Sequence, residues 1–304
     1  MSNSTYQSDV EAVDALAQSY QKLKQEIGRV IVGQNDVVQA VIISLFSNGH
    51  SLLVGVPGLA KTLLVSTIAE VLDLDFKRIQ FTPDLMPSDI TGSEILDEDR
   101  HFKFNPGPLF SNIVLADEIN RTPPKTQAAL LEAMQEKSVT VSGVRHALPN
   151  PFFVLATQNP IEQEGTYPLP EAQLDRFMFK VIVGYPSEIE EEQILSLHSQ
   201  QIDLNKRLVD ELKTVTSPEE IMQIVVENAK VRVEPSLITY INRIVRQTRS
   251  WPSFHLGASP RAGLALMQGA RTLSALRGRD YATPDDVVDI CLPALRHRVI
   301  LSAE

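Results

Sequence analysis

The octet GVPGLAKT at residues 55–62 places the strongest constraint on how this 304-residue chain can fold. It follows an apolar run at 52–54 and precedes apolar residues at helical spacing from Leu63 to Val71. The octet nearly matches the phosphate-binding pattern G-x-x-x-x-G-K-[ST], which stands between a strand and a helix. The segment therefore predicts a strand–loop–helix unit of an α/β fold.

Such a loop binds anions through its backbone N–H groups and the N-terminus of the helix that follows. Lys61 is expected to reach the β- and γ-phosphates of a nucleotide, and the Thr62 hydroxyl to bind Mg²⁺. Ala60 replaces the second glycine of the pattern, and alanine is strained where φ is positive. We therefore predict a negative φ at Ala60, with Gly55 and Gly58 giving the loop its unusual backbone path. The alternative is a glycine-containing turn that only ends a strand.

Apolar segments that alternate with helical patterns predict a mainly parallel five-stranded sheet with helices on both faces. Two further segments, 94–104 and 138–144, have alternating apolar residues around a polar turn and predict β-hairpin inserts. Helical spacing of apolar residues predicts N-terminal helices over 9–29 and 34–47. The five expected strands are 51–55, 76–81, 112–117, 152–157 and 179–184.

The pattern changes after residue 186, where no long apolar strand remains. Capping boxes, in which a Ser or Thr stands three residues before an acid, predict the starts of helices. We therefore expect an α/β core over 1–186 and an all-helical portion over 187–304. The three capping boxes are Ser187 with Glu190, Ser217 with Glu220, and Thr283 with Asp286.

Polar side chains follow two of the expected strands. The strand at 113–117 ends in the adjacent acids Asp117 and Glu118. Asp117 is expected to hold Mg²⁺, and Glu118 to act as a general base on the attacking water. Asn159 follows another apolar strand, and a strand between the loop strand and the acid strand could aim it at the γ-phosphate. The alternatives are an ordinary polar turn at the acids and a turn asparagine before Pro160.

Composition narrows the classes of partner and the location. The net charge of −10 disfavours generic binding to nucleic acid or anionic membranes, because phosphate contacts need a basic surface. Neither a signal-peptide pattern nor an apolar stretch of membrane-spanning length is found, so the expected location is the cytoplasm. The single cysteine, Cys291, is expected to pack as a small apolar residue, and the lone Trp251 to pack in the core or lid.

Five motifs in order, GVPGLAKT, LADEIN, ATQNP, EAQLDRF and SPRA, resemble those of an AAA+ ATPase, specifically the MoxR family. The resemblance covers nearly the whole chain, from the segment IVGQ at 31–34 onward. It implies a P-loop AAA+ core followed by a helical lid, and ATP hydrolysis that depends on Mg²⁺. Alanine at the position of Ala60 is a familiar variant in that family.

The resemblance also implies roles for single residues. Asn159 matches sensor 1, Arg176 an arginine finger that reaches a neighbouring subunit, and Arg261 the sensor 2 that ties the lid to the nucleotide. The alternatives are a surface salt bridge of Arg176 with Asp175 or Glu171, and a solvated helix start at Arg261. Arg121 could either cross a subunit boundary or be a plain loop arginine. The expected catalytic residues are Lys61, Glu118, Asn159 and Arg176, and the expected metal ligands are Thr62 and Asp117. The expected nucleotide-binding residues are Val32, Gly33, Gly55, Val56, Pro57, Gly58, Leu59, Ala60, Lys61, Thr62, Leu63 and Arg261.

As for partners, the resemblance implies a homo-oligomer, a hexameric ring, that remodels or activates a client protein. That role would be chaperone-like, metal or cofactor insertion, or complex assembly. It also implies a separate partner with a von Willebrand factor A domain. The hairpins match inserts, at 92–107 and 138–148, that face the pore or the substrate in related rings. Arg145 and His146 would lie near one of them, or simply at a solvated strand end. Two other functions remain open: a nucleotide-dependent switch with little turnover, and a DNA-acting relative, which the acidic balance disfavours.

Overall fold

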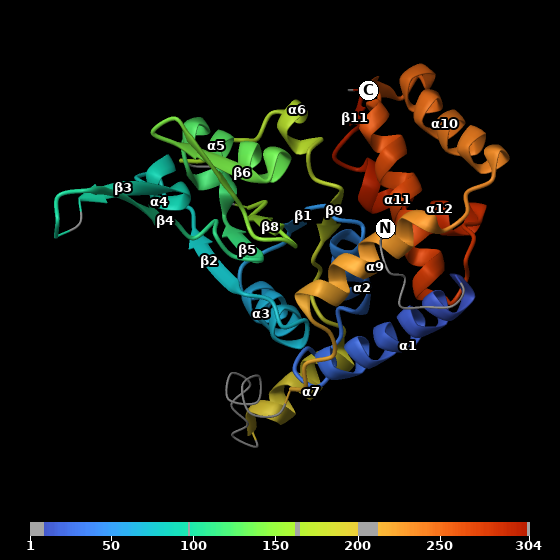
Figure 1. The fold of residues 1–304 in the computed structure, drawn as a ribbon. Helices are drawn as coiled ribbons and strands as arrows, with labels where there is room; N and C mark the ends of the chain where they lie inside the picture. The colour runs from blue at the N-terminus through green and yellow to red at the C-terminus, as the bar shows by residue number, and fades with distance from the viewer. Residues whose placement is uncertain (1–8, 97, 162–164, 200–211, 303–304) are drawn as a thin grey trace.

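The computed structural model describes residues 9–96, 98–161, 165–199 and 212–302. Its centre is a five-stranded sheet in the order β2-β5-β8-β1-β9, in which every neighbouring pair is parallel (Figure 1). All five predicted strands are present, and the parallel pairing is confirmed. The strands are β1 (Ser51–Val54), β2 (Phe76–Gln80), β5 (Ile113–Asp117), β8 (Phe153–Gln158) and β9 (Phe179–Ile182).

Successive residues of the buried strands point to opposite faces of the sheet, and each face has its own apolar cluster. Leu53 and Leu115 pack in the cluster that includes α2 and α3, while Leu52 and Val114 pack in the cluster that includes α5. Helices therefore cover both faces, as the continuous apolar strands predict. The core helices are α1 (Asp9–Ile27), α2 (Asn35–Phe46), α3 (Lys61–Val71), α4 (Pro87–Thr91), α5 (Pro124–Glu136) and α6 (Glu171–Leu174).

Both predicted hairpin inserts are present. One pairs β3 (Gly92–Leu96) with β4 (Phe102–Pro106), and the other pairs β6 (Ser138–Val141) with β7 (Val144–Ala147). The β3–β4 hairpin projects far from the sheet, at the left of Figure 1. The two hairpins contact each other, because the Phe104 ring of β4 stacks on the His146 ring of β7 at 3.9 Å between centroids.

The C-terminal part is a helical lid, and the acid of each predicted capping box accepts a backbone N–H at a helix start. The expectation that it is all-helical is wrong in one detail, because β10 (Phe254–Leu256) and β11 (Ile300–Leu301) form a small antiparallel pair. These strands are too short for an alternating pattern to reveal them in the sequence. The helices after the sheet are α7 (Glu188–Ser199), α9 (Pro218–Lys230), α10 (Pro235–Ser250), α11 (Pro260–Leu276) and α12 (Pro284–Leu295).

Three further features qualify the sequence expectations. Cys291 is partly buried against the apolar core, as expected, and burial raises the pKa of its thiol. Trp251 does not pack in the core, because it ends α10 at the surface with 52% of its area exposed. Among the helices of the described residues, none combines the length and the apolar character needed to cross a membrane.

Candidate functional site

The loop at 55–60 joins β1 to α3 at the carboxyl edge of the sheet, as the motif predicts. The Lys61 ammonium is folded back on this loop, where it donates to the carbonyl oxygens of Gly55 (2.6 Å) and Val56 (3.3 Å). Burial lowers the pKa of Lys61, and the carboxylates of Asp117 and Glu118 oppose that shift. The lysine and the two acids therefore lie within electrostatic reach of one another.

The predicted backbone of this loop is only partly correct. Ala60 has φ 52° and ψ 26°, so the prediction of a negative φ is wrong. The residue stands directly before α3, and the left-handed conformation turns the chain from the loop into the helix at a cost of about 1–2 kcal/mol for alanine. Gly58 has φ 86°, as expected of a glycine that gives the loop its path. Gly55 is not left-handed, and a Cβ there would lie 2.6 Å from the Val183 carbonyl oxygen, so close packing requires the glycine.

Asp117 ends β5 and is held on both of its oxygens. Its Oδ1 accepts from the Thr157 hydroxyl (2.6 Å), which in turn accepts from the backbone N–H of Glu118 (2.8 Å). Its Oδ2 accepts from Nε (3.1 Å) and Nη2 (2.6 Å) of Arg78. The carboxylate is therefore kept in one orientation by β8 on one side and β2 on the other.

Glu118 follows in a left-handed conformation, with φ 57°. Its Oε2 accepts from the Gln80 amide (3.0 Å) and from Arg121 (3.0 Å). The structure thus places Arg121 beside the acid of its own chain. The sequence alone does not predict the contacts of Arg78, Gln80 and Thr157, because they depend on which strands are neighbours in the sheet.

Asn159 follows β8, and β8 pairs with β1 on one side and β5 on the other. The expected strand order around this residue is therefore confirmed. Asn159 is buried, and its Oδ1 accepts from the backbone N–H of Ile161 (3.1 Å). The amide lies at the same edge of the sheet as Lys61 and the two acids.

A cavity of about 420 Å³ adjoins the loop on the side of the IVGQ segment. Its walls are mostly apolar, and α7 lines one side of it. Gln34 donates to the Leu59 carbonyl oxygen (3.2 Å), which joins the segment to the loop. Val32 lines the cavity, whereas Gly33 faces the Glu190 side chain beside it. Further lining residues include Val30, Ile31, Pro57, Gly58, Ala60, Leu63, Tyr185, Ile194 and Leu195.

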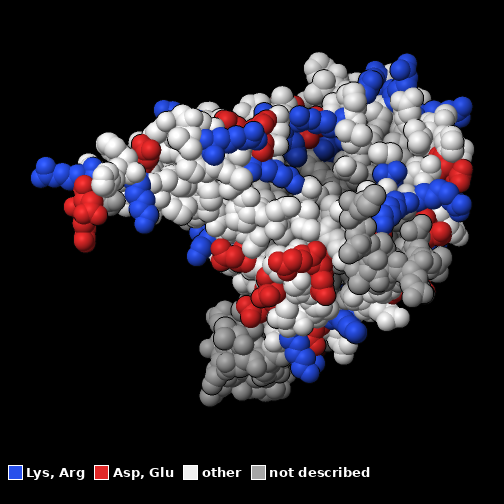
Figure 2. Space-filling model, in the orientation of Figure 1, with Lys and Arg blue, Asp and Glu red and all other residues white. Residues whose placement is uncertain are grey.

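A second cavity, of about 320 Å³, lies between α5, the segment after α6, and the lid. Lys and Arg side chains gather on this part of the face in Figure 2. We call it the basic pocket, and its charged residues are Lys137, Asp175, Arg176, Arg261 and Arg298.

The basic pocket contains both Arg176 and Arg261, for which the sequence leaves alternative roles open. Asp175 is engaged by Arg298 (Nε to Oδ1, 2.7 Å) and by the Ser259 hydroxyl (2.7 Å), while Arg176 donates to the Leu131 carbonyl oxygen (2.8 Å). The two arginines line the same pocket, and neither lines the cavity beside the loop. The structure therefore places Arg261 with Arg176 and not with the nucleotide-binding loop of its own chain.

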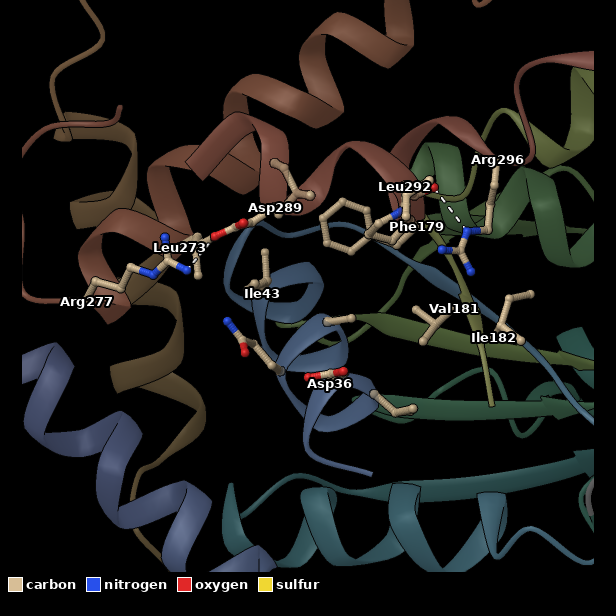
Figure 3. Close-up of a pocket in the computed structure, with 15 residues that line it drawn as sticks. Asp36, Ile43, Phe179, Val181, Ile182, Leu273, Arg277, Asp289, Leu292 and Arg296 are labelled. Atoms are coloured by element: carbon tan, nitrogen blue, oxygen red, sulfur yellow. Dashed lines mark hydrogen bonds and ion pairs between the residues drawn. The ribbon is translucent and has the colours of Figure 1, made fainter. Parts of the chain in front are cut away.

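A third cavity, of about 460 Å³, lies where the core meets the lid (Figure 3). Ile43 of α2 and Phe179 and Val181 of β9 face Leu273 and Leu292 of the lid across it. Its walls contain none of the residues that the motifs single out. The cavity lies at the junction between core and lid.

The residues at the edge of the sheet fit Mg²⁺ and a nucleotide. Thr62 and Asp117 offer the hard oxygen ligands that Mg²⁺ prefers, and Mg²⁺ in nucleotide sites takes few protein ligands beside phosphates and water. Among the residues that the structure describes, no cluster of three or more His, Cys, Asp or Glu suited to a metal occurs.

Comparisons with known proteins agree with this site. Residues 50–179 match the ATPase family associated with various cellular activities (AAA), and residues 246–304 match the AAA lid domain. The chain is 49% identical to the uncharacterized protein YeaC of Bacillus subtilis, over 93% of this chain and 87% of that one. It is 46% identical to the chaperone MoxR1 of Mycobacterium tuberculosis, over 91% and 74%.

A crystal structure from Cytophaga hutchinsonii, of a protein assigned to the ATPases, has the same fold. It superposes with a TM-score of 0.88 at 42% identity, covering 96% of this chain and 90% of that one. Together with the P-loop, the paired acids and the lid, these matches show that the chain belongs to the MoxR family of AAA ATPases.

Proposed function

We propose that this chain is a Mg²⁺-dependent ATPase subunit that works in a ring and remodels a client protein. The observation that carries the proposal is the mutual proximity of Lys61, Asp117 and Glu118 at the carboxyl edge of the sheet. Within that site Lys61 binds the β- and γ-phosphates, and Thr62 and Asp117 hold the metal. The Mg²⁺ ion, when bound, neutralises phosphate charge that develops during the transfer.

Glu118 then acts as the general base on the attacking water, and Asn159 orients that water or the γ-phosphate from the neighbouring strand end. The loop at 55–60 binds the phosphates through its backbone N–H groups, and Val32 with the apolar cavity beside α7 binds the base and sugar. For catalysis Glu118 must exchange its contacts with Gln80 and Arg121 for a contact to water.

The basic pocket supports the proposal of a ring. We infer that Arg176 and Arg261 both reach the γ-phosphate in a neighbouring subunit, since neither lines the cavity beside the loop of its own chain. A ring of six is the arrangement the motifs favour. We further propose that the lid (187–304) moves relative to the core (1–186) during the cycle, which the cavity between β9 and α12 supports.

A remodelling role is supported by two observations. A close relative is called a chaperone, and apolar side chains are exposed on the projecting β3–β4 hairpin, with Phe102 at 72% and Leu96 at 60%. Such side chains suit transient contact with an apolar client segment. We also propose the cytoplasm as the location and a separate protein with a von Willebrand factor A domain as a partner.

The test replaces Glu118 by Gln in the full chain. ATP turnover is expected to fall by about 10²–10⁴, the usual contribution of a general base, while ATP binding persists. The matched control is Glu70→Gln, the same substitution at an exposed acid of α3, which should leave turnover unchanged. A wild-type chain that binds ATP without turning it over would instead support a nucleotide-dependent switch. Salt-sensitive DNA binding would favour a DNA-acting relative.

A further inference from the structure

Arg78, on the edge strand β2, is the counter-ion of Asp117 in this structure. Two of its nitrogens, Nε and Nη2, donate to one carboxylate oxygen, Oδ2, at 3.1 and 2.6 Å, while Thr157 donates to the other oxygen. The Asp117 side chain is only 13% exposed, so solvent screens this pair less than an ordinary surface ion pair. The side chain of Arg78 itself is 47% exposed.

The sheet register explains why Arg78 meets the acid. In the parallel pairing of β2 with β5, Gln80 lies beside Asp117, and Arg78 lies two residues earlier on the same face. Nη2 of Arg78 also donates to the Gln80 amide oxygen (2.7 Å), and the amide nitrogen of Gln80 donates to Glu118 (3.0 Å). One arginine is thus linked to both acids, directly or through one side chain.

This arrangement conflicts with metal binding at the same carboxylate. A metal ion held by Asp117 needs the lone pairs and the negative charge that Arg78 now uses, and two cations around one carboxylate repel each other. Arg78 can leave because it lies on an edge strand with about half of its side chain already in solvent. Thr157 remains to keep the carboxylate oriented after the arginine has left.

We propose that Arg78 is exchanged for Mg²⁺ at Asp117 when the nucleotide site is loaded, and that Arg78 thereby sets the Mg²⁺ concentration at which Mg·ATP binds. The inference rests on the proposed function, which assigns Asp117 to the metal. The opposing possibility is that Arg78 positions Asp117 for the metal. The two differ in sign, because removal of a competing cation tightens Mg²⁺-dependent binding, whereas removal of a positioning group weakens it.

The experiment measures binding of a fluorescent ATP analogue to the full chain as Mg²⁺ is increased. Arg78→Gln is expected to lower the Mg²⁺ concentration for half-maximal binding by on the order of tenfold, because a neighbouring arginine typically changes proton binding at an aspartate by that factor or more. The matched control is Lys77→Gln, which removes one positive charge from the next residue of the same strand and should leave that concentration unchanged.

Two results would overturn the exchange. An unchanged Mg²⁺ requirement in Arg78→Gln means that the arginine does not compete, and an increased requirement means that it positions Asp117. If Arg78→Gln fails to give a cooperative melting curve, Arg78→Lys takes its place. That variant keeps a charge but not the two-donor contact, so a smaller shift in the same direction is expected.

Failure of the inference can be told apart from failure of the proposed function. If binding to the wild-type chain does not depend on Mg²⁺, or if Asp117→Asn leaves that dependence unchanged, the assignment of Asp117 to the metal is wrong. If the wild-type dependence is present and Asp117→Asn abolishes it, but Arg78→Gln behaves like Lys77→Gln, only the role of Arg78 is wrong.

Discussion

The edge of the sheet and the basic pocket balance charge in opposite ways. At the edge each acid has a basic partner in the same chain, since Arg78 contacts Asp117 and Arg121 contacts Glu118. In the basic pocket one carboxylate stands among four cations: Asp175 among Lys137, Arg176, Arg261 and Arg298. Both acids of the edge are thus paired within the chain, whereas the basic pocket has an excess of positive charge that suits an anion from outside the chain.

Hydrogen bonds made by Arg298 fix the positions of core and lid around the basic pocket. Arg298 is buried, and besides Asp175 it donates to the carbonyl oxygens of Phe177 (2.6 Å) and Met178 (2.9 Å). A buried charge is costly unless it is paired and fully hydrogen-bonded, and this one is. The clamp ties the end of the lid to the core segment beside Arg176. Arg176 and Arg261 are therefore presented together, from core and lid, on one face.

The largest expected effect is the loss of ATP turnover when an arginine of the basic pocket is removed. Arg176→Ala should lower ATP turnover by about 10³, within the range known for arginine fingers, and leave ATP binding intact. Arg261→Ala should act in the same direction. When either variant is mixed with Lys61→Ala, turnover should partly recover. Mixed rings then contain interfaces with one intact loop and both arginines intact.

The mixture of Arg176→Ala with Arg261→Ala gives the decisive comparison. If both arginines act on the neighbouring subunit, every interface lacks one of them, so turnover stays low. Recovery of turnover would mean that Arg261 acts on the nucleotide bound to its own subunit. Arg176 and Arg261 would then not act together on the neighbouring subunit. Mixed assembly is checked with tagged subunits. Arg246→Ala, at an exposed position of α10, is the matched control and should remain active.

A second prediction concerns how the free energy of unfolding depends on pH. Two buried histidines, His50 and His297, lie beside the basic pocket. Nδ1 of His50 accepts from the Val154 N–H (3.0 Å), so Nε2 bears the proton and donates to the Met134 carbonyl oxygen (3.2 Å). Burial lowers the pKa of His50 to about 4 and is the main cause that lowers the pKa of His297 to about 3. Both side chains are therefore neutral in the folded protein at pH 7.

The sign of the pH effect follows from these values. The unfolded chain takes up the histidine protons near pH 6.5, above either folded pKa, so the free energy of unfolding falls as the pH decreases below about 6.5. From pH 7 to pH 5 each histidine should cost about 2 kcal/mol. Thermal unfolding at several pH values measures this dependence. His297→Gln should remove about half of it, whereas the control His198→Gln, on the surface of α7, should leave it unchanged. If His297→Gln keeps the full dependence, the buried neutral histidine is not its source.

The same two regions show what the sequence can predict. Strands, hairpins and capping boxes follow from local spacing, and Asn159 could be placed because its strand had to lie near the two motif strands. The contact of Arg78 with Asp117 depends on β2 lying next to β5, which no local pattern encodes. The place of Arg261 depends on how the lid docks, through Arg298 and Ser259, on the distant Asp175. Local signals therefore predict the edge of the sheet far better than the basic pocket.

The smallest expected effect is at Ala60, where the sequence predicts a negative φ and the structure has a positive one. Alanine at φ 52° destabilises the folded state by about 1–2 kcal/mol, a strain that glycine relieves. Glycine also increases the conformational entropy of the unfolded chain, which offsets about 0.5–1 kcal/mol of this gain. Ala60→Gly should therefore raise the free energy of unfolding by up to about 1 kcal/mol, as measured by denaturant titration. Ala128→Gly, at an exposed position within α5, is the matched control and should lower it by about 0.5–1 kcal/mol. If both substitutions lower it, the left-handed backbone at Ala60 is wrong, and the loop has the negative φ expected from the sequence.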